Sequence, residues 1–337
     1  RPPQSLTRMT PPLPLARRAF LKQSGLAAAT AVAPLILPSG LRGANAPSRK
    51  ITVGIVGSGN IADSHYGKLL GEQETVRILA VCDVDRERRD EGAARVNRTY
   101  GTQDCKAYAD FRELNRRPDI DAVFICTPDH WHAPVSAAAM RSGKDVYCEK
   151  PLTLTVREGR TLVDLARSHG RILQTGTQQR SNKSFRKAAE IVRNGWIGDI
   201  KVIRTRLGKF PEALPLPEEP IPAGFDYDRW LGPTPWRPYN EKRVKGDYGG
   251  GWRCFFEYGG RKNGDWGAHH FDIIQNALGM DTSGPVEFIP KGYEGCAYQT
   301  HVYANGIRVE RDDDLPKSMI EFRGTKGTVW VSRDDFL

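Results

Sequence analysis

The run Ile51 to Val56 leads directly into Gly57-Ser58-Gly59-Asn60-Ile61-Ala62. A mostly apolar run of this length is typical of a buried parallel strand. The G-x-G-x-x-A pattern that follows predicts a tight turn into a helix, in which the second glycine lets a pyrophosphate approach the backbone and Ala62 lets the helix pack closely on the strand. This segment is therefore predicted to form the phosphate cradle of a dinucleotide-binding fold.

The residues after this cradle predict an alternation of strands and helices. Strands are expected at 51–56, 76–82, 121–126, 145–148 and 171–175, and helices at 61–71, 86–99, 133–142 and 156–169. Such alternation predicts a parallel sheet with helices on both faces, an α/β Rossmann domain.

Asp83 ends the second predicted strand, at the spacing where an acid binds the adenosine ribose. Its carboxylate would repel a 2′-phosphate, which favours NAD over NADP as the cofactor. Ser58 and the arginines within 86–89 leave room for NADP.

A second domain is predicted from the change of pattern after residue 176. An amphipathic helix at 184–194 is followed by a strand of alternating character at 201–207. Residues 211–238 hold eight prolines, so they are expected to form an ordered loop rather than a central strand or a long helix. Aromatic residues gather in or just after this loop, and either sugar stacking or oligomer packing would explain them: Trp230, Trp236, Tyr239, Trp252, Phe255 and Phe256.

Three further segments carry residues suited to chemistry. They are Thr127-Pro128-Asp129-His130-Trp131-His132, Cys148-Glu149-Lys150-Pro151 and Asp265-Trp266-Gly267-Ala268-His269. A strand at 145–148 would deliver Lys150 to the carboxyl edge of the sheet, where ligands bind in such folds. On a helix, Asp265 and His269 share one face because they are four residues apart, whereas His270 points about 100° away and is the weaker candidate. Phe271, Ile274 and Leu278 form a separate apolar stripe that would anchor that helix.

Taken in this order and spacing, these segments resemble the Gfo/Idh/MocA family, which includes glucose-fructose oxidoreductase and inositol dehydrogenase. The resemblance covers Lys50 to the end of the chain. It implies a second α+β domain with an open, mostly antiparallel sheet, through which a homo-oligomer would form. It also implies a cis peptide bond before Pro151 and further residues beyond Leu337, so the second domain is expected to be incomplete. The predicted domains are 1–46, 47–176 and 177–337.

The same resemblance implies the roles of the site residues. Lys150 would lie beside the nicotinamide and the reacting hydroxyl, with Asp265 and His269 as orienting acid and proton acceptor. His132 is the more favoured cofactor contact of its loop, one histidine of which could instead cap the following helix. Gln179 stands where many relatives have an arginine. The full set of cofactor candidates is Gly57, Ser58, Gly59, Asn60, Ile61, Asp83, Thr127, Pro128, His130, His132, Glu149, Lys150 and Gln178; the substrate candidates are Lys150, Arg180, Asp265 and His269.

The first 46 residues carry six Arg or Lys and no acid. Arg17-Arg18 followed by the apolar run 27–37 resembles a twin-arginine export signal, with Ala44-Asn45-Ala46 as a cleavage pattern. The expected partner is the twin-arginine export machinery and the expected location is the periplasm; a basic tail and an uncleaved membrane anchor are the alternatives. Without these residues the formal charge falls from +10 to +4, which does not indicate a nucleic-acid partner.

The six cysteines are expected to be free rather than paired in disulfides. Cys82, Cys126 and Cys148 lie in predicted strands, where cysteine behaves as a small buried hydrophobe. No Cys/His spacing indicates a zinc site, so no metal is predicted.

Together these features predict an exported NAD(P)-dependent oxidoreductase that acts on a hydroxyl of a sugar, polyol or glycoside. A soluble cofactor outside the cytoplasm is not easily recycled, which favours tightly bound NAD. The alternatives are an NAD-dependent glycosidase that uses transient oxidation and elimination, and a non-catalytic sensor that binds NAD and a sugar.

Overall fold

The computed structural model describes residues 50–213, 215–246, 250–317 and 319–337. The predicted export signal at 1–46 lies outside the described residues. Within 50–337 the chain forms two sheets of different kinds. The first packs against a hydrophobic core on each face, and the second has a core of its own.

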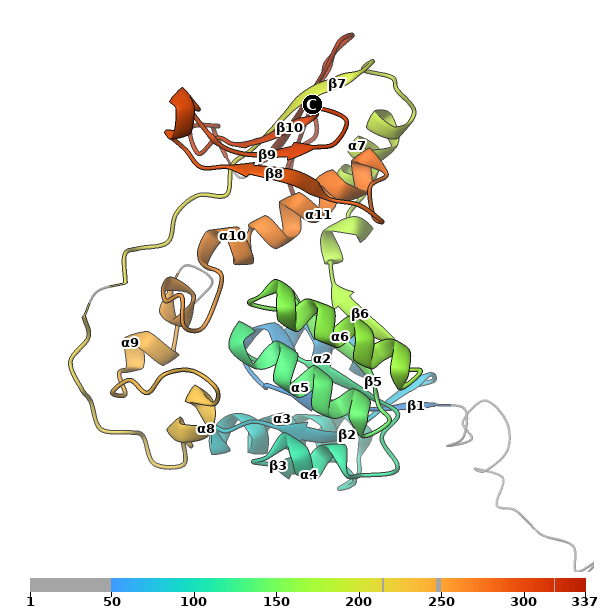
Figure 1. Cartoon of the computed structure of the whole chain (residues 1–337). Coiled ribbons are helices and arrows are strands. Elements are labelled where there is room, and N and C mark those ends of the chain that lie inside the picture. Colours follow the sequence, from blue (N-terminus) through green and yellow to red (C-terminus); the bar gives the residue numbers. More distant parts are fainter. Residues whose placement is uncertain (1–49, 214, 247–249, 318) are drawn as a thin grey trace, which may run out of the picture. The chain divides into compact units, whose positions relative to one another are not determined.

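The first sheet is parallel, as the alternation predicted (Figure 1). It has six strands, one more than expected, in the order β3-β2-β1-β4-β5-β6. Its strands are β1 (Ile51–Val56), β2 (Val76–Cys82), β3 (Lys106–Tyr108), β4 (Ala122–Ile125), β5 (Asp145–Glu149) and β6 (Leu173–Gly176). The helices are α2 (Asn60–Gly71), α3 (Arg86–Tyr100), α4 (Phe111–Asn115), α5 (Asp129–Arg141) and α6 (Val156–Ser168). One core lies between the sheet and α2 and α3, and the other between the sheet and α4, α5 and α6, so helices cover both faces.

Local sequence explains where several of these helices begin and end. The Asp85 side chain accepts from the N–H of Glu87 at the start of α3, and Gly101 ends that helix in the left-handed conformation. Thr155 and Glu158 form a capping box at the start of α6. Each cap satisfies backbone groups that the helix itself leaves unpaired.

Helix α5 departs from the prediction. It begins at Asp129 rather than at residue 133, with Pro128 as its N-cap residue. Pro134 lies inside the helix, although proline is normally favoured only in the first turn. As a consequence, His130, Trp131 and His132 belong to the start of a helix and not to a loop.

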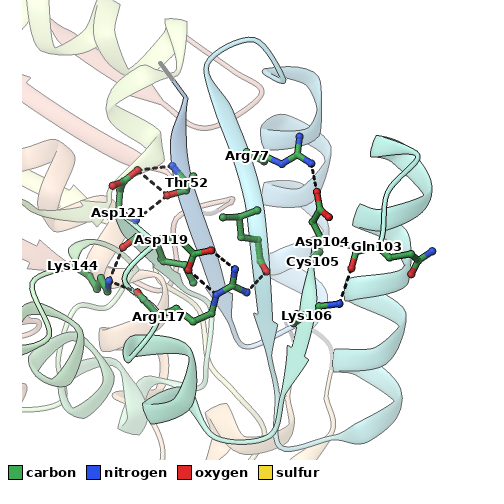
Figure 2. Close-up of polar contacts among 12 residues, drawn as sticks. Thr52, Arg77, Gln103, Asp104, Cys105, Lys106, Arg117, Asp119, Asp121 and Lys144 are labelled. Carbon is green, nitrogen blue, oxygen red and sulfur yellow. Dashed lines mark hydrogen bonds and ion pairs between the residues drawn. The ribbon is translucent and has the colours of Figure 1, made fainter. Parts of the chain in front are cut away.

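Polar side chains tie the strands together at the amino end of the first sheet (Figure 2). Asp121 accepts hydrogen bonds from the backbone N–H and the hydroxyl of Thr52, both at 2.8 Å. Lys144 donates to the carbonyls of Arg117 and Ile120 at 2.6 and 2.7 Å, and Arg117 forms an ion pair with Asp119. At the amino end of the sheet these polar groups are paired with one another. Ligands of such folds bind at the opposite end, at the carboxyl edge.

The second sheet is mixed, in the order β12-β11-β7-β10-β9-β8, with only β7 and β10 parallel. Its strands are β7 (Ile200–Thr205), β8 (Pro285–Ile289), β9 (Gln299–Tyr303), β10 (Arg308–Arg311), β11 (Ile320–Gly324) and β12 (Thr328–Val331). The elements outside the sheet are η3 (Gln178–Ser181), α7 (Lys183–Arg193), α10 (Arg261–Asp265), α11 (Gly267–Leu278) and η5 (Tyr293–Gly295). Helices α7 and α11 pack their apolar faces on this sheet, with Ile274 fully buried.

Residues 209–259 connect β7 to α10 and are called the connecting segment below. It contains only the short helices α8 (Tyr227–Leu231), α9 (Glu241–Val244) and η4 (Gly251–Cys254) among its described residues. Several of its aromatic side chains form a small core of their own: Phe210, Tyr227, Trp230, Tyr239, Phe255 and Tyr258. Trp230, Tyr239 and Phe255 are therefore buried within the segment itself, which neither sugar stacking nor oligomer packing would require. Trp236 and Phe256 remain exposed.

All six cysteines lie in the described part of the chain and are free thiols, and Cys82, Cys126 and Cys148 are buried as predicted. Of the helices in the described ranges, none combines the length and the apolar character that crossing a membrane requires.

Candidate functional site

The turn after β1 forms a phosphate cradle that only glycine can make. Gly57 has φ +87°, and a Cβ atom there would lie 2.6 Å from the carbonyl carbon of Cys126. Beyond the turn is a cavity of about 730 Å³ whose wall includes Gly57, Gly59, Asn60 and Ile61. This volume falls in the range of small-molecule sites, and the backbone groups at the start of α2 suit a pyrophosphate.

Asp83 lies in the wall of the same cavity. Its two carboxylate oxygens accept from the backbone N–H groups of Ser58, at 2.7 Å, and Asp85, at 2.9 Å. Burial raises the pKa of the Asp83 carboxyl above its ordinary value, while the two N–H donors act in the opposite direction. Each oxygen keeps a further lone pair, so the carboxylate can still accept from ribose hydroxyls.

The connecting segment closes one side of the cavity, which the sequence did not indicate. Its backbone meets the β2–α3 junction, where Asp226 N–H donates to the Val84 carbonyl at 3.1 Å and Arg86 N–H to the Gly224 carbonyl at 3.0 Å. Phe225, Trp230 and Arg253 of this segment line the cavity, together with Thr127 and Pro128.

His130 and Trp131 hold the connecting segment in place. The His130 Nε2 atom lies 2.8 Å from the Trp230 carbonyl oxygen, and the Trp131 indole N–H donates to the same carbonyl at 3.0 Å. Gly232 must be glycine because a Cβ atom there would lie 2.1 Å from the Trp131 ring. His130 is thus placed against protein, and its predicted cofactor contact stays a prediction.

Lys150 and Asp265 form a partly buried ion pair between the two domains. The Lys150 ammonium donates to Asp265 Oδ1 at 2.7 Å and to the Asp265 carbonyl at 3.2 Å. The guanidinium Nε of Arg253 lies 3.7 Å from the same carboxylate oxygen, so Arg253 joins this pair to the cofactor cavity. The peptide bond between Lys150 and Pro151 is cis, as the resemblance implied.

The residues on either side of Lys150 are held by histidines. His132 places its two ring nitrogens 2.6 Å from the Pro151 carbonyl oxygen and 2.9 Å from that of Thr127. The Glu149 carboxylate lies 2.8 Å from His65 Nε2, and both side chains are buried. His132 and Glu149 therefore position the loop that carries Lys150, and their predicted contacts with the cofactor remain predictions.

His269 lies beside Arg333 and Gln179. Arg333 donates through Nη2 to His269 Nε2 and through Nε to Gln179 Oε1, both at 3.2 Å. A guanidinium has no acceptor atom, so Nε2 is the lone-pair nitrogen of His269 and Nδ1 carries the hydrogen. Burial lowers the pKa of His269 to about 2, and the charges of Lys150 and Arg333 add to that effect. His269 is thus a neutral imidazole in this structure.

Asp265 and His269 do not lie on one continuous helix. Asp265 ends α10, and α11 begins at Gly267 after Trp266. The Asp265 carboxylate is directed to Lys150 and Arg253, while His269 meets Arg333, so the expected orienting contact between the two is replaced by these partners. His270 is fully buried, and its Nδ1 atom lies 2.8 Å from the Thr205 hydroxyl.

Arg180 takes part in a separate network. Its guanidinium is bidentate to Asp272, at 2.8 and 2.7 Å, and also contacts Asp281 at 2.8 Å. These two carboxylates raise the pKa of Arg180. Its contacts give it a structural role, and its predicted substrate contact stays a prediction. Gln178 begins η3 next to Gln179 and is not among the residues that line the described cavity, so its predicted cofactor contact stays a prediction.

Asp129 is a site residue that the sequence did not single out. It is 5% exposed, in the first turn of α5, and interacts electrostatically with Lys150, Arg253 and Asp265. Burial raises the pKa of its carboxyl to about 8, although Lys150 and Arg253 oppose the shift. In the sequence, the only signal for Asp129 is its position between Pro128 and His130. No group of three or more His, Cys, Asp or Glu side chains that could hold a metal ion occurs in the ranges that the structure describes.

Two family models match the chain. One, described as an oxidoreductase family with an NAD-binding Rossmann fold, matches residues 51–177, and the other, the C-terminal alpha/beta domain of an oxidoreductase family, matches residues 187–306. The first domain is therefore an NAD-binding Rossmann domain, and the glycine cradle, the cavity and Asp83 fit that cofactor.

Several known proteins are similar to this chain. Myo-inositol 2-dehydrogenase of Thermotoga maritima is 30% identical over 180 residues, which are 53% of this chain and 49% of that protein. Inositol 2-dehydrogenase of Salmonella typhimurium is 29% identical over 176 residues, 52% of this chain and 50% of that protein. The chain thus spans about half the length of the curated relatives it matches.

The fold is shared with solved structures. An oxidoreductase from Thermotoga maritima superposes with a TM-score of 0.61 at 22% identity, over 86% of this chain and 81% of the other. The WlbA dehydrogenase from Bordetella pertussis, crystallised with NADH and UDP-GlcNAcA, has a TM-score of 0.61 at 18% identity, over 86% and 82%. At such identities the likeness shows the fold alone.

Proposed function

This chain belongs to the Gfo/Idh/MocA family of oxidoreductases, and we propose that it oxidises a hydroxyl group of a sugar, polyol or glycoside with NAD as cofactor. The observation that carries the proposal is the partly buried Lys150–Asp265 ion pair, joined through Arg253 to the cavity that the glycine cradle lines. Inositol dehydrogenases among the relatives support the choice of a carbohydrate hydroxyl.

In that reaction bound NAD would supply the oxidant, a nicotinamide ring that accepts a hydride. Three residues of this chain have chemical roles beside it. The Lys150 ammonium donates a hydrogen bond to the substrate oxygen and stabilises the negative charge that develops there. Asp265 holds the ammonium in place, and the neutral imidazole of His269 accepts the hydroxyl proton.

A panel of polyols, hexoses and glycosides tests the proposal, with NAD and NADP each added to the purified protein. We expect reduced nicotinamide to form with at least one member of the panel, at a rate that falls at least ~100-fold in Lys150→Met. Binding of NAD without turnover of any member would favour the sensor. Release of the aglycone without net formation of NADH would favour the glycosidase chemistry.

Export by the twin-arginine route is part of the same proposal, and its support is the sequence of the first 46 residues. Replacing Arg17-Arg18 by Lys-Lys should block export and leave a folded, NAD-bound protein in the cytoplasm. Unchanged export of that variant would contradict the assignment. Within the cell, tightly held NAD would be bound before export.

We also propose a homo-oligomer formed through the second sheet. Its edge strand β8 carries the exposed apolar side chains Val286 and Phe288, 67% and 65% exposed. Exposed apolar groups of this kind mark association surfaces. A molar mass from light scattering tests the idea, and a monomer that persists at high protein concentration would reject it.

A further inference from the structure

The groups around His269 present hydrogen-bond donors and few acceptors. Because Arg333 donates to His269 Nε2 and to Gln179 Oε1, the atoms left over are His269 Nδ1–H and the Gln179 amide N–H₂. Both of these nitrogens are buried, and neither has a hydrogen-bond partner among the residues described. Buried donors without a partner are costly, so this cluster is complementary to a ligand that brings acceptor oxygens.

The same cluster carries an excess of positive charge. Lys150 is paired with the carboxylate of Asp265. Lys262 and Arg333 lie 5.9 and 4.6 Å from the centre of the Trp266 ring, and in the described chain the contacts of Arg333 are with neutral groups. The neighbouring Asp129 does not balance these charges near pH 7, because its raised pKa keeps its carboxyl largely protonated.

We propose that the substrate of this site carries an anionic oxygen group, a carboxylate or a phosphate, which is bound by Arg333 and Gln179. Binding of that group draws Arg333 away from His269 and frees the Nε2 lone pair to accept the hydroxyl proton. The inference rests on the proposed function, since it names the class of carbohydrate that the dehydrogenase would oxidise.

One structural observation and two chemical arguments support the movement of Arg333. Its side chain is exposed and follows the last strand, β12, so it can turn without disturbing a core. As long as Arg333 donates to Nε2, His269 has no free lone pair and cannot act as a base. An anion competes well for the guanidinium, because hydrogen bonds between charged groups are stronger than that to a neutral imidazole.

The test compares matched sugars on the full-length, NAD-loaded protein. Glucose is compared with glucuronate and with glucose 6-phosphate, and the galactose series is measured in the same way. We expect kcat/KM to be at least ~10-fold higher for the acidic member, and the preference to decrease with added salt. The two acidic sugars separate a carboxylate from a phosphate as the recognised group.

Arg333→Met separates recognition from a structural role. On the acidic sugar kcat/KM should fall ~10- to 100-fold, the usual range for a lost charged hydrogen bond. On the neutral sugar it should stay unchanged or rise, because His269 is no longer occupied by Arg333. Arg333→Lys should restore part of the acidic preference. Arg186→Gln, at an exposed position of α7, is the control and should change neither activity.

Equal loss on both sugars in Arg333→Met, or a neutral sugar preferred by the wild type, would overturn the inference and leave the proposed dehydrogenase intact. If no sugar of the panel is oxidised, the dissociation constants of the same sugar pairs are measured on the NADH-loaded protein instead. A lack of preference for the acidic member in that measurement overturns it as well. Loss of NAD binding itself would instead count against the proposed function.

Discussion

We expect His269 to remain uncharged between about pH 5 and 8, the range in which an ordinary histidine titrates. Its pKa is lowered from 6.5 to about 2, first by burial and then by the charges of Lys150 and Arg333. A decrease of this size corresponds to about 6 kcal/mol against the imidazolium form. The acid limb of turnover should therefore not lie near pH 6.5, the pKa of an ordinary histidine.

Perturbing one of the two cations tests the cause of the shift. Arg333→Met removes a positive neighbour, which stabilises the imidazolium and should raise the pKa of His269. Burial is the largest cause and remains, so the pKa of the variant should stay below 6.5. Nitrogen NMR of labelled histidines across the pH range follows the ring directly, and His269→Gln identifies its signal among the seven histidines.

The free energy of unfolding gives an independent check. In the unfolded chain His269 has its ordinary pKa, so it takes up a proton below about pH 6.5 while the folded state does not. The stability that the neutral imidazole contributes is therefore complete above that pH and falls as the pH drops below it. Between pH 7 and pH 5 the loss from His269 alone should be about 2 kcal/mol.

Denaturant unfolding at pH 7 and at pH 5 measures this loss. In the His269→Gln variant the part of the loss that comes from His269 should be absent. The comparison between variant and wild type isolates His269, since Asp129, whose pKa is raised to about 8, has the opposite dependence in both proteins. A wild-type His269 that titrates between pH 6 and 7, or an equal pH dependence in the variant, would refute the reasoning.

Three substitutions test other parts of the site. Lys150→Met should leave NAD binding intact while turnover falls at least ~100-fold, measured by steady-state kinetics; near-normal turnover would contradict the role of Lys150. Asp83→Ala removes the acceptor of two backbone N–H groups, so we expect a loss of about 1–3 kcal/mol in stability. It also removes the ribose acceptor and the repulsion of a 2′-phosphate, so calorimetry should show that NAD binding is weakened more than NADP binding. Gly57→Ala should abolish NAD binding because its Cβ would overlap Cys126. The control Gly101→Ala, with φ +66° and open space around it, should lose only the stability that a left-handed backbone costs a non-glycine residue. Equal losses of NAD binding in the two variants would argue against the cradle.

The sequence predicted the first domain well because its information is local. The strands at 51–56 and 76–82 are observed with these bounds, since long apolar runs can be buried only in a central parallel sheet. Strand β3 was missed because its three residues are not an apolar run, and α4 because it has only five. The helix expected from residue 133 begins four residues earlier, at Asp129, and accommodates Pro134 in its interior.

The connecting segment shows what local reasoning cannot supply. Its prolines correctly excluded a long helix or a central strand, but nothing in its sequence indicated that it would meet the β2–α3 junction, which is about 140 residues away along the chain. That contact depends on backbone hydrogen bonds, which every residue except proline can make. Its partners are therefore decided by the fold and not by residue type.

The candidate site divides along the same line. Lys150 could be placed at the carboxyl edge of the sheet because a strand and Pro151 flank it. The helical spacing of Asp265 and His269 predicted that they share one helix face, but the helix is interrupted at Trp266 and the two side chains have different partners. The chemical state of His269 could not be predicted in that way, because it depends on Arg333, which is 64 residues further along the chain, and on burial by the second domain. Spacing shows which side chains can meet, but a pKa is set by every charge and every apolar group around the ring. It follows that the base in this site is controlled from outside its own helix, and that a substitution at Arg333 should change the behaviour of His269 more than one at His270 next to it.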